Sequence, residues 1–82
     1  MSSIVAKLTD AGIDLTGVKH TTGARSEEFC VPGHPNQSNQ HAFAALPGIA
    51  KMLEYLGYEL RIGECKVGGG NKVIDRVIVD YS

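Results

Sequence analysis

The sequence predicts a small α+β fold: a two-layer sandwich in the order helix-strand-strand-helix-strand-strand, with a C-terminal antiparallel hairpin. Three observations predict it. Apolar residues recur at helical spacing near the N-terminus and again over 47–56, and the last third of the chain alternates apolar and polar residues around a glycine cluster. The 82 residues suffice for one domain, 1–82, in which two layers bury a single core.

Residues 2–12 form the first predicted helix, because their apolar positions follow helical spacing. Ser2 or Ser3 can act as the N-cap, since a serine hydroxyl accepts a hydrogen bond from a free backbone amide of the first turn. Gly12 suits the left-handed position that commonly follows the last helical turn. A helix this short is marginal in isolation, so we expect it to pack on a sheet.

Two strands are expected next. Weak alternation over 13–23 predicts a strand with an irregularity near Gly17, and residues 28–31 predict a second strand. Pro32 ends that second strand, because proline has no amide hydrogen to donate to a neighbouring strand.

Pro47 decides how the second helical region is interpreted. A proline inside a helix costs about 3 kcal/mol, whereas at the first helical position it costs almost nothing. We therefore expect a short helix over 39–45, capped by Ser38, and a main helix over 47–56, or else one kinked helix. Gly57 ends this region.

The C-terminal third predicts a hairpin. A change of phase between the apolar residues on either side of Gly63 predicts a β-bulge there. The cluster 68–71 predicts the turn, because glycine and asparagine tolerate positive φ. Residues 73–81 then form a long strand with apolar residues on both faces, which is typical of a central strand. We expect Val73, Val77, Val79 and Tyr81 on one face and Ile74 and Ile78 on the other.

Composition and charge narrow the function classes. Eight Lys and Arg against nine Asp and Glu give a net charge of -1, so the cationic surface typical of nucleic-acid binders is lacking and nucleic acid is an unsupported partner. The longest apolar run, 77–79, is far too short to cross a membrane, which takes about 20 residues. We expect a cytoplasmic protein without a membrane partner. Two cysteines are too few for a disulfide scaffold.

Metal binding and catalysis find little support in the sequence. Cys30, His34, His41 and Cys65 are residue types that zinc prefers, but they lack the two close pairs of a strong zinc signature. We expect the cysteines to be buried thiols and the histidines to be exposed in loops, with no metal and no cofactor.

No catalytic residue is assigned either. A thiolate beside a histidine is suggested only by Cys30 and His34, and Cys30 is expected in the core. The adjacent carboxylates Glu27 and Glu28 point to opposite faces of a strand and are expected to be exposed, so they form no acid–base pair.

Binding residues are expected in two places. The loop 32–40 is rich in amide side chains, which make adaptable hydrogen bonds to a partner, and loops on rigid scaffolds often carry function. Lys66 and Lys72 flank the glycine cluster, which can be read as an anion cradle or as a plain hairpin turn. The candidate binding residues are His34, Asn36, Gln37, Asn39, Gln40, Lys66 and Lys72.

Residues 2–58 resemble, in their layout, the HicA family of small toxin RNases. The features that carry the resemblance are a helix ending at Ala11-Gly12, an extended segment with His20, the run Val31-Pro32-Gly33-His34-Pro35, and a helix from Leu46-Pro47-Gly48 to Leu56-Gly57-Tyr58. The resemblance implies mRNA cleavage with His20 in the catalytic role. The chain departs from the family pattern where Val18-Lys19 replaces the Gly-Ser before this histidine, and where a whole hairpin follows the second helix.

A second stretch, 53–63, resembles the end of antitoxin-type helix-turn-helix regulators, or of a winged helix whose wing is the hairpin 59–81. This resemblance implies a DNA-binding regulator. A DNA-reading helix presents Arg, Lys, Asn or Gln outward, whereas residues 47–56 present only Lys51 and Glu54.

The leading hypothesis is a small non-enzymatic binding protein of phage or mobile-element type. It would act as an inhibitor or regulator by covering the surface of a host or phage protein. A homodimer through Ile74, Ile78 and Tyr81 is expected as well, because a strand that is apolar on both faces needs cover on both sides. The DNA-binding regulator and the HicA-like toxin remain the alternatives.

Overall fold

A computed structural model describes residues 3–81 of the chain. Its elements are α1 (Ser3–Asp10), β1 (Lys19–Thr22), β2 (Ser26–Cys30), α2 (Gln40–Tyr55), β3 (Glu59–Lys66), the short 3₁₀ turn η1 (Gly68–Gly70) and β4 (Lys72–Asp80). The predicted α+β class and the order helix-strand-strand-helix-strand-strand are confirmed.

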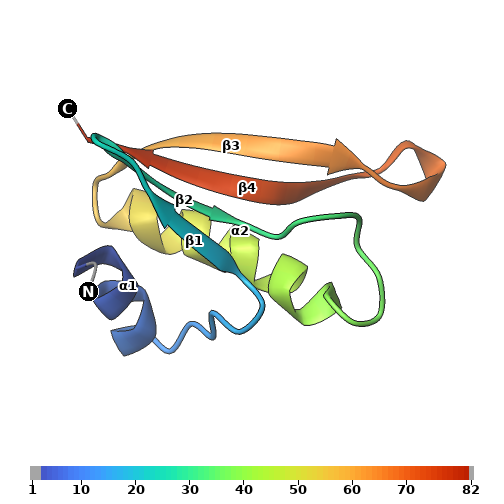
Figure 1. Ribbon diagram of the computed structural model, residues 1–82, viewed down its shortest axis with the longest axis horizontal. Helices are drawn as coiled ribbons and strands as arrows, with labels where there is room; N and C mark the ends of the chain where they lie inside the picture. The colour runs from blue at the N-terminus through green and yellow to red at the C-terminus, as the bar shows by residue number, and fades with distance from the viewer. Residues whose placement is uncertain (1–2, 82) are drawn as a thin grey trace.

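The four strands form one antiparallel sheet in the order β1-β2-β4-β3. Each half of the chain contributes a hairpin, and α2 carries the chain from β2 to β3 so that β4 is inserted between them. Figure 1 shows both helices below the sheet and the tip of the β3–β4 hairpin projecting beyond them. The long C-terminal strand is therefore central, as its apolar composition predicts.

The core lies between the sheet and the helices. Phe29 on β2 and Val77 and Val79 on β4 are fully buried. The helices contribute Ile4, Leu8, Ala42, Phe43, Leu46, Ile49 and Leu53 to the same cluster. Because α2 packs chiefly on β4 and touches β3 less, the helix side of β3 is only partly covered.

Both helices end as the sequence predicts. Gly57 has a φ of 92°, its amide donates to Glu54 at 3.0 Å, and the amide of Tyr58 donates to Leu53 at 3.1 Å, which is the Schellman arrangement. Gly12 ends α1 in the same way. At the start of α1, Ser3 is already helical, and Ser2 lies outside the described residues.

Of the two alternatives expected for this region, two separate helices are wrong and a single helix is present, because α2 runs from Gln40 to Tyr55 with Pro47 inside it. Pro47 lies on an exposed side of the helix, where its ring is accommodated at the cost of one backbone hydrogen bond. The predicted cap is wrong as well. Asn39 occupies the N-cap position, and the Ser38 hydroxyl donates to Asn36 Oδ1 at 2.6 Å.

The strand expected over 13–23 is much shorter, since β1 covers only Lys19–Thr22. A turn precedes it, in which the amide of Val18 donates to Leu15 at 3.0 Å and Gly17 has a φ of 82°. A Cβ atom on Gly17 would lie 3.1 Å from Ala42 Cβ, so the turn also needs glycine to approach α2.

The bulge predicted near Gly63 is present, but its extra residue is Asp75 on β4 rather than a residue of β3. Gly63 pairs with Arg76 and Glu64 with Ile74, so Asp75 has no partner on β3. Its carbonyl instead accepts a hydrogen bond from the amide of Val31 at 3.1 Å. This extra residue corrects the predicted faces, because it turns Ile74 toward α2, where it packs against the core.

Candidate functional site

A pocket of about 600 Å³ opens where the loop 32–39 and the first half of α2 face the outer end of the β3–β4 hairpin. We call it the loop-side pocket. Its lining residues are Pro35, Gln40, Phe43, Ala44, Pro47, Glu64, Lys72, Val73 and Ile74. Apolar side chains therefore form most of the wall, and three polar side chains interrupt it.

A second pocket of about 550 Å³ continues along the same side of α2 above β3. We call it the strand-side pocket. It shares Pro47 and Ile74 with the loop-side pocket, so the two form one groove. Its other lining residues are Gly48, Ala50, Lys51, Glu54, Tyr58, Leu60 and Ile62. The groove exists because α2 presents small residues, Gly48 and Ala50 among them, beside a strand that it does not cover.

The structure brings two of the predicted binding residues, Gln40 and Lys72, together at the loop-side pocket. Lys66 lies directly opposite Lys72 in the hairpin but does not line this pocket. Like charges at opposed positions repel each other, so the pair keeps two ammonium groups near the pocket mouth at some cost in stability. The turn between them connects β3 to β4 as a hairpin, closed by a 2.8 Å hydrogen bond from the amide of Val67 to the carbonyl of Asn71.

The loop 32–39 is held by its own amide side chains. Asn36 Oδ1 accepts hydrogen bonds from the Ser38 amide at 2.9 Å and from the Asn39 amide at 3.1 Å. The Asn39 side chain accepts from the Asn36 amide at 2.7 Å and donates to the His34 carbonyl at 3.0 Å. Asn36 and Asn39 therefore shape the loop, while the exposed side chains of His34 and Gln37 face solvent.

A polar cluster centres on Glu27, which the sequence predicts to be exposed and which is buried in the structure. Glu27 is 8% exposed. Its carboxylate lies 2.7 Å from His20 Nε2 and accepts a hydrogen bond from the Tyr81 hydroxyl. The His20 ring stacks on Phe29 with the ring centroids 4.8 Å apart. Strand alternation predicts correctly that Glu27 and Glu28 face opposite ways, but the partners of Glu27 lie too far away in sequence to be recognised.

This cluster changes the pKa of the tyrosine. Burial, followed by the hydrogen bond to Glu27 and the charge of that carboxylate, raises the pKa of Tyr81 from 10.0 to about 12. The phenol is thus held in its neutral, donating form beside the carboxylate. The sequence does not reveal this contact, because Tyr81 and Glu27 are 54 residues apart.

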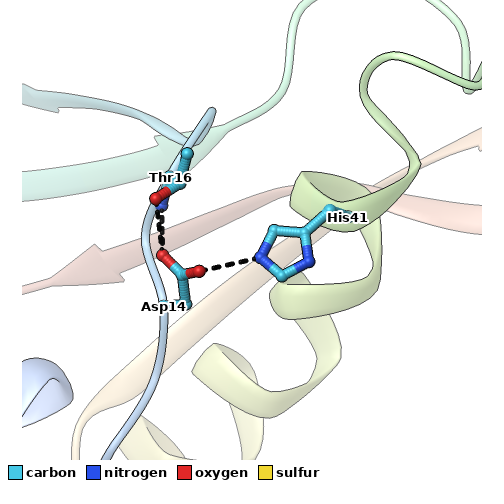
Figure 2. A network of polar contacts seen from close by, with 3 residues as sticks. All are labelled: Asp14, Thr16 and His41. Atoms are coloured by element: carbon cyan, nitrogen blue, oxygen red, sulfur yellow. Dashed lines mark hydrogen bonds and ion pairs between the residues drawn. The ribbon is translucent and has the colours of Figure 1, made fainter.

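A second polar cluster joins the turn before β1 to α2. Figure 2 shows the Asp14 carboxylate between Thr16 and His41. It accepts hydrogen bonds from the Thr16 hydroxyl at 2.6 Å and the Thr16 amide at 2.9 Å, and it lies 2.9 Å from His41 Nε2. These contacts, with the Thr16 side chain first, lower the pKa of Asp14 to about 2. His41 lies on α2, within the region 39–45 where the sequence predicts a helix, rather than in a loop, and it ties the helix to this turn.

The two cysteines are free thiols and lie apart from the core. Cys30 is half-buried on the opposite face of β2 from Phe29, which corrects its expected place in the core. Burial and the neighbouring Glu28 raise the pKa of the Cys30 thiol, so it is a poor nucleophile. Within residues 3–81, no group of three or more His, Cys, Asp and Glu side chains is arranged to hold a metal ion.

Comparison with protein-family models, with curated proteins and with solved structures gives no match for this chain. None of the helices within residues 3–81 is long and apolar enough to cross a membrane. The groove beside α2 and the polar contacts around Glu27 are therefore the features of this chain that point to a function.

Proposed function

We propose that this chain is a non-enzymatic binding protein that holds an apolar segment of a partner protein in the loop-side pocket. The observation that carries the proposal is the composition of that pocket. Phe43, Val73 and Ile74 offer an apolar wall, and Gln40 and Lys72 stand where they can fix the orientation of a ligand. Binding sites for protein side chains have this character, an apolar centre within a polar margin.

The ionisable groups of the pocket favour binding over catalysis. Glu64 and Lys72 line it, and histidine and cysteine do not. The Asn36 and Asn39 hydrogen bonds hold the neighbouring loop in one shape, which lowers the entropy lost when a partner binds. The partner is a host or phage protein, and the chain acts on it as an inhibitor or regulator by covering part of its surface.

Ala44 provides the test, because it is exposed and lines the loop-side pocket. Ala44→Arg fills this pocket with a charged side chain. Ala24→Arg is the matched control, since Ala24 is exposed in the turn between β1 and β2. We expect a protein captured by the wild type and by Ala24→Arg to be lost with Ala44→Arg at unchanged melting temperature. Equal capture by all three proteins, or capture of nucleic acid in place of protein, contradicts the proposal.

RNA cleavage is the second candidate function, and the contact between His20 and Glu27 favours it. A buried carboxylate that orients an imidazole is a common arrangement in acid–base catalysis, where the acid–base group contributes about 10²- to 10⁴-fold in rate. If the chain only binds, purified wild type leaves RNA intact and His20→Ala affects stability alone. Cleavage by the wild type that is lost in a folded His20→Ala variant would establish the RNase in place of the binding protein.

A further inference from the structure

We infer that β3 pairs with β3 of a second copy of this chain, so that two sheets join into one across a two-fold axis at Ile62. The inference goes beyond the proposed function and does not depend on it. It rests on three features of β3: a free backbone edge, a partly covered apolar face, and a pattern of charged and apolar side chains that favours one register.

The backbone edge of β3 is open. The strand spans Glu59–Lys66, eight residues, and within residues 3–81 it bonds to β4 on one side alone. Proteins commonly protect such an edge with a proline, with a bulge in the edge strand itself or with charged side chains, and of these β3 carries only the charges, on Glu59, Arg61, Glu64 and Lys66. β3 contains no proline, and the extra residue of the bulge, Asp75, lies on β4. Its amides and carbonyls are therefore available to another strand.

The face of β3 that points toward α2 needs cover. Leu60 and Ile62 lie on this face opposite the buried Val79 and Val77. Because α2 lies over β4, Ile62 remains 45% exposed. An added strand beside β3 would extend the sheet past the strand-side pocket and shield this apolar surface from water.

A two-fold axis perpendicular to the sheet sets the possible registers. Opposed residues in an antiparallel pair share a face, so the register changes in steps of two residues. With the axis at Ile62, this residue meets its own copy, Leu60 meets Glu64, and Arg61 meets Gly63. This arrangement places no like charges directly opposite each other.

The neighbouring registers are poorer. A step in one direction places Arg61 against Arg61 of the second copy, which is repulsive. A step in the other direction places Ile62 against Glu64 and Leu60 against Lys66, so both apolar residues of this face meet charged groups. In the register centred on Ile62, only Leu60 does, and Ile62 meets an apolar partner. In the register centred on Ile62, Arg61 also keeps its bidentate contact with Asp80 of its own chain, at 2.7 and 3.0 Å.

The outer face of the sheet, where a dimer through Ile78 would form, is less suitable. The partners of Ile78 in the sheet are Glu28 and Arg61, so burying this face would also bury charges. Ile74 packs against the core under α2, and Tyr81 donates to Glu27. The three residues expected at a dimer contact therefore do not form one surface.

Disulfide trapping tests the register. In a Cys30→Ser and Cys65→Ser background, Ile62→Cys places two thiols at the axis, where opposed Cα atoms lie about 4.5 to 5.5 Å apart, within disulfide range. Leu60→Cys is the matched control, because it faces Glu64 of the second copy. We expect Ile62→Cys to form a cross-linked dimer under mild oxidation and Leu60→Cys to remain uncross-linked. Equal cross-linking by both variants, or none by Ile62→Cys, overturns the register.

Sedimentation tests the surface. We expect a wild-type dimer at micromolar concentration, a monomer for Ile62→Glu, and a dimer for Ile78→Glu, each with the circular dichroism of the wild type. A monomeric wild type overturns the inference, as does a dimer that Ile78→Glu disrupts and Ile62→Glu leaves intact. Because these measurements need no partner protein, they can fail while the proposed binding function stands.

Discussion

Glu27 joins three parts of the sheet through its carboxylate, which contacts His20 on β1 and Tyr81 after β4. We expect Tyr81→Phe to lower the free energy of unfolding by about 1 to 2 kcal/mol, because a buried carboxylate loses one hydrogen-bond donor. Urea denaturation measures the change. Tyr55→Phe is the control, since Tyr55 is 85% exposed. Equal losses in the two variants would mean that the hydroxyl contact with Glu27 adds nothing.

The same hydroxyl makes stability depend on alkaline pH. The fold raises the pKa of Tyr81 from 10.0 to about 12, so its neutral form is favoured in the folded state. The corresponding stabilisation is complete below pH 10 and is lost as the pH rises through about 12. We expect the wild type to lose stability over this interval and Tyr81→Phe to lose less. Unfolding monitored by circular dichroism across this range compares the two, and parallel curves would contradict the assignment.

Residue-level contacts of this kind are where sequence reasoning fails. Alternation correctly separates Glu27 from Glu28, but whether a carboxylate on a given face is buried depends on partners that meet it in space. His20 is 7 residues away and Tyr81 is 54 residues away, and neither separation is a recognisable pattern. The hydropathy of glutamate predicts exposure, and that prediction is wrong wherever such partners exist.

Among the elements, the loop 32–39 is stiffer than its composition predicts. Because Asn36 accepts three hydrogen bonds, we expect Asn36→Ala to lower the melting temperature by several degrees, at about 1 kcal/mol or more. Gln37→Ala, at an exposed neighbour, should leave it unchanged. Thermal denaturation measures both variants, and equal melting temperatures would show that the hydrogen bonds of Asn36 do not stabilise the loop.

Pro47 is the second element-scale prediction. It lies inside α2 and leaves a backbone carbonyl one turn earlier without its usual donor. Pro47→Ala restores that donor, so we expect the free energy of unfolding to rise by up to about 3 kcal/mol. Chemical denaturation measures it, with Ala44→Gly as a helix variant expected to be destabilising. A loss of stability in Pro47→Ala would show that the proline ring packs productively in the groove.

The helix ends marked by glycine were predictable from sequence, whereas the start of α2, its passage through Pro47 and the details of strand register were not. Gly12 and Gly57 end their helices because the left-handed position is a local demand. The change in the apolar alternation on either side of Gly63 indicates a bulge at this position. It does not show which strand carries the extra residue, and the structure places that residue, Asp75, on β4. That single difference moved Ile74 to the α2 side. The groove itself follows from where α2 lies on the sheet, which no local pattern encodes.

At the scale of the whole molecule, pairing through β3 couples folding to concentration. A dimer that forms only from folded chains is stabilised by mass action, so its melting temperature rises with protein concentration. We expect such a rise for the wild type and a concentration-independent value for Ile62→Glu. Scanning calorimetry over a hundred-fold range of protein concentration measures this rise. Over that range, mass action adds at most about 2.7 kcal/mol to the stability of the dimer. A wild-type melting temperature that stays constant across this range would argue for a monomer.

The insertion of β4 between β2 and β3 has a consequence for the order of events on the ribosome. Chains fold as they emerge, N-terminal parts first, yet the strand that completes the middle of this sheet is the last one synthesised within residues 3–81. Until it appears, β2 and β3 have no strand between them, and the apolar side of α2 lacks Val77 and Val79. A nascent chain in which β4 has not yet emerged therefore presents an unpaired β3 and the open edge of β2 to chaperones and proteases. Emergence of β4, rather than translation of the helices, commits this part of the chain to its fold.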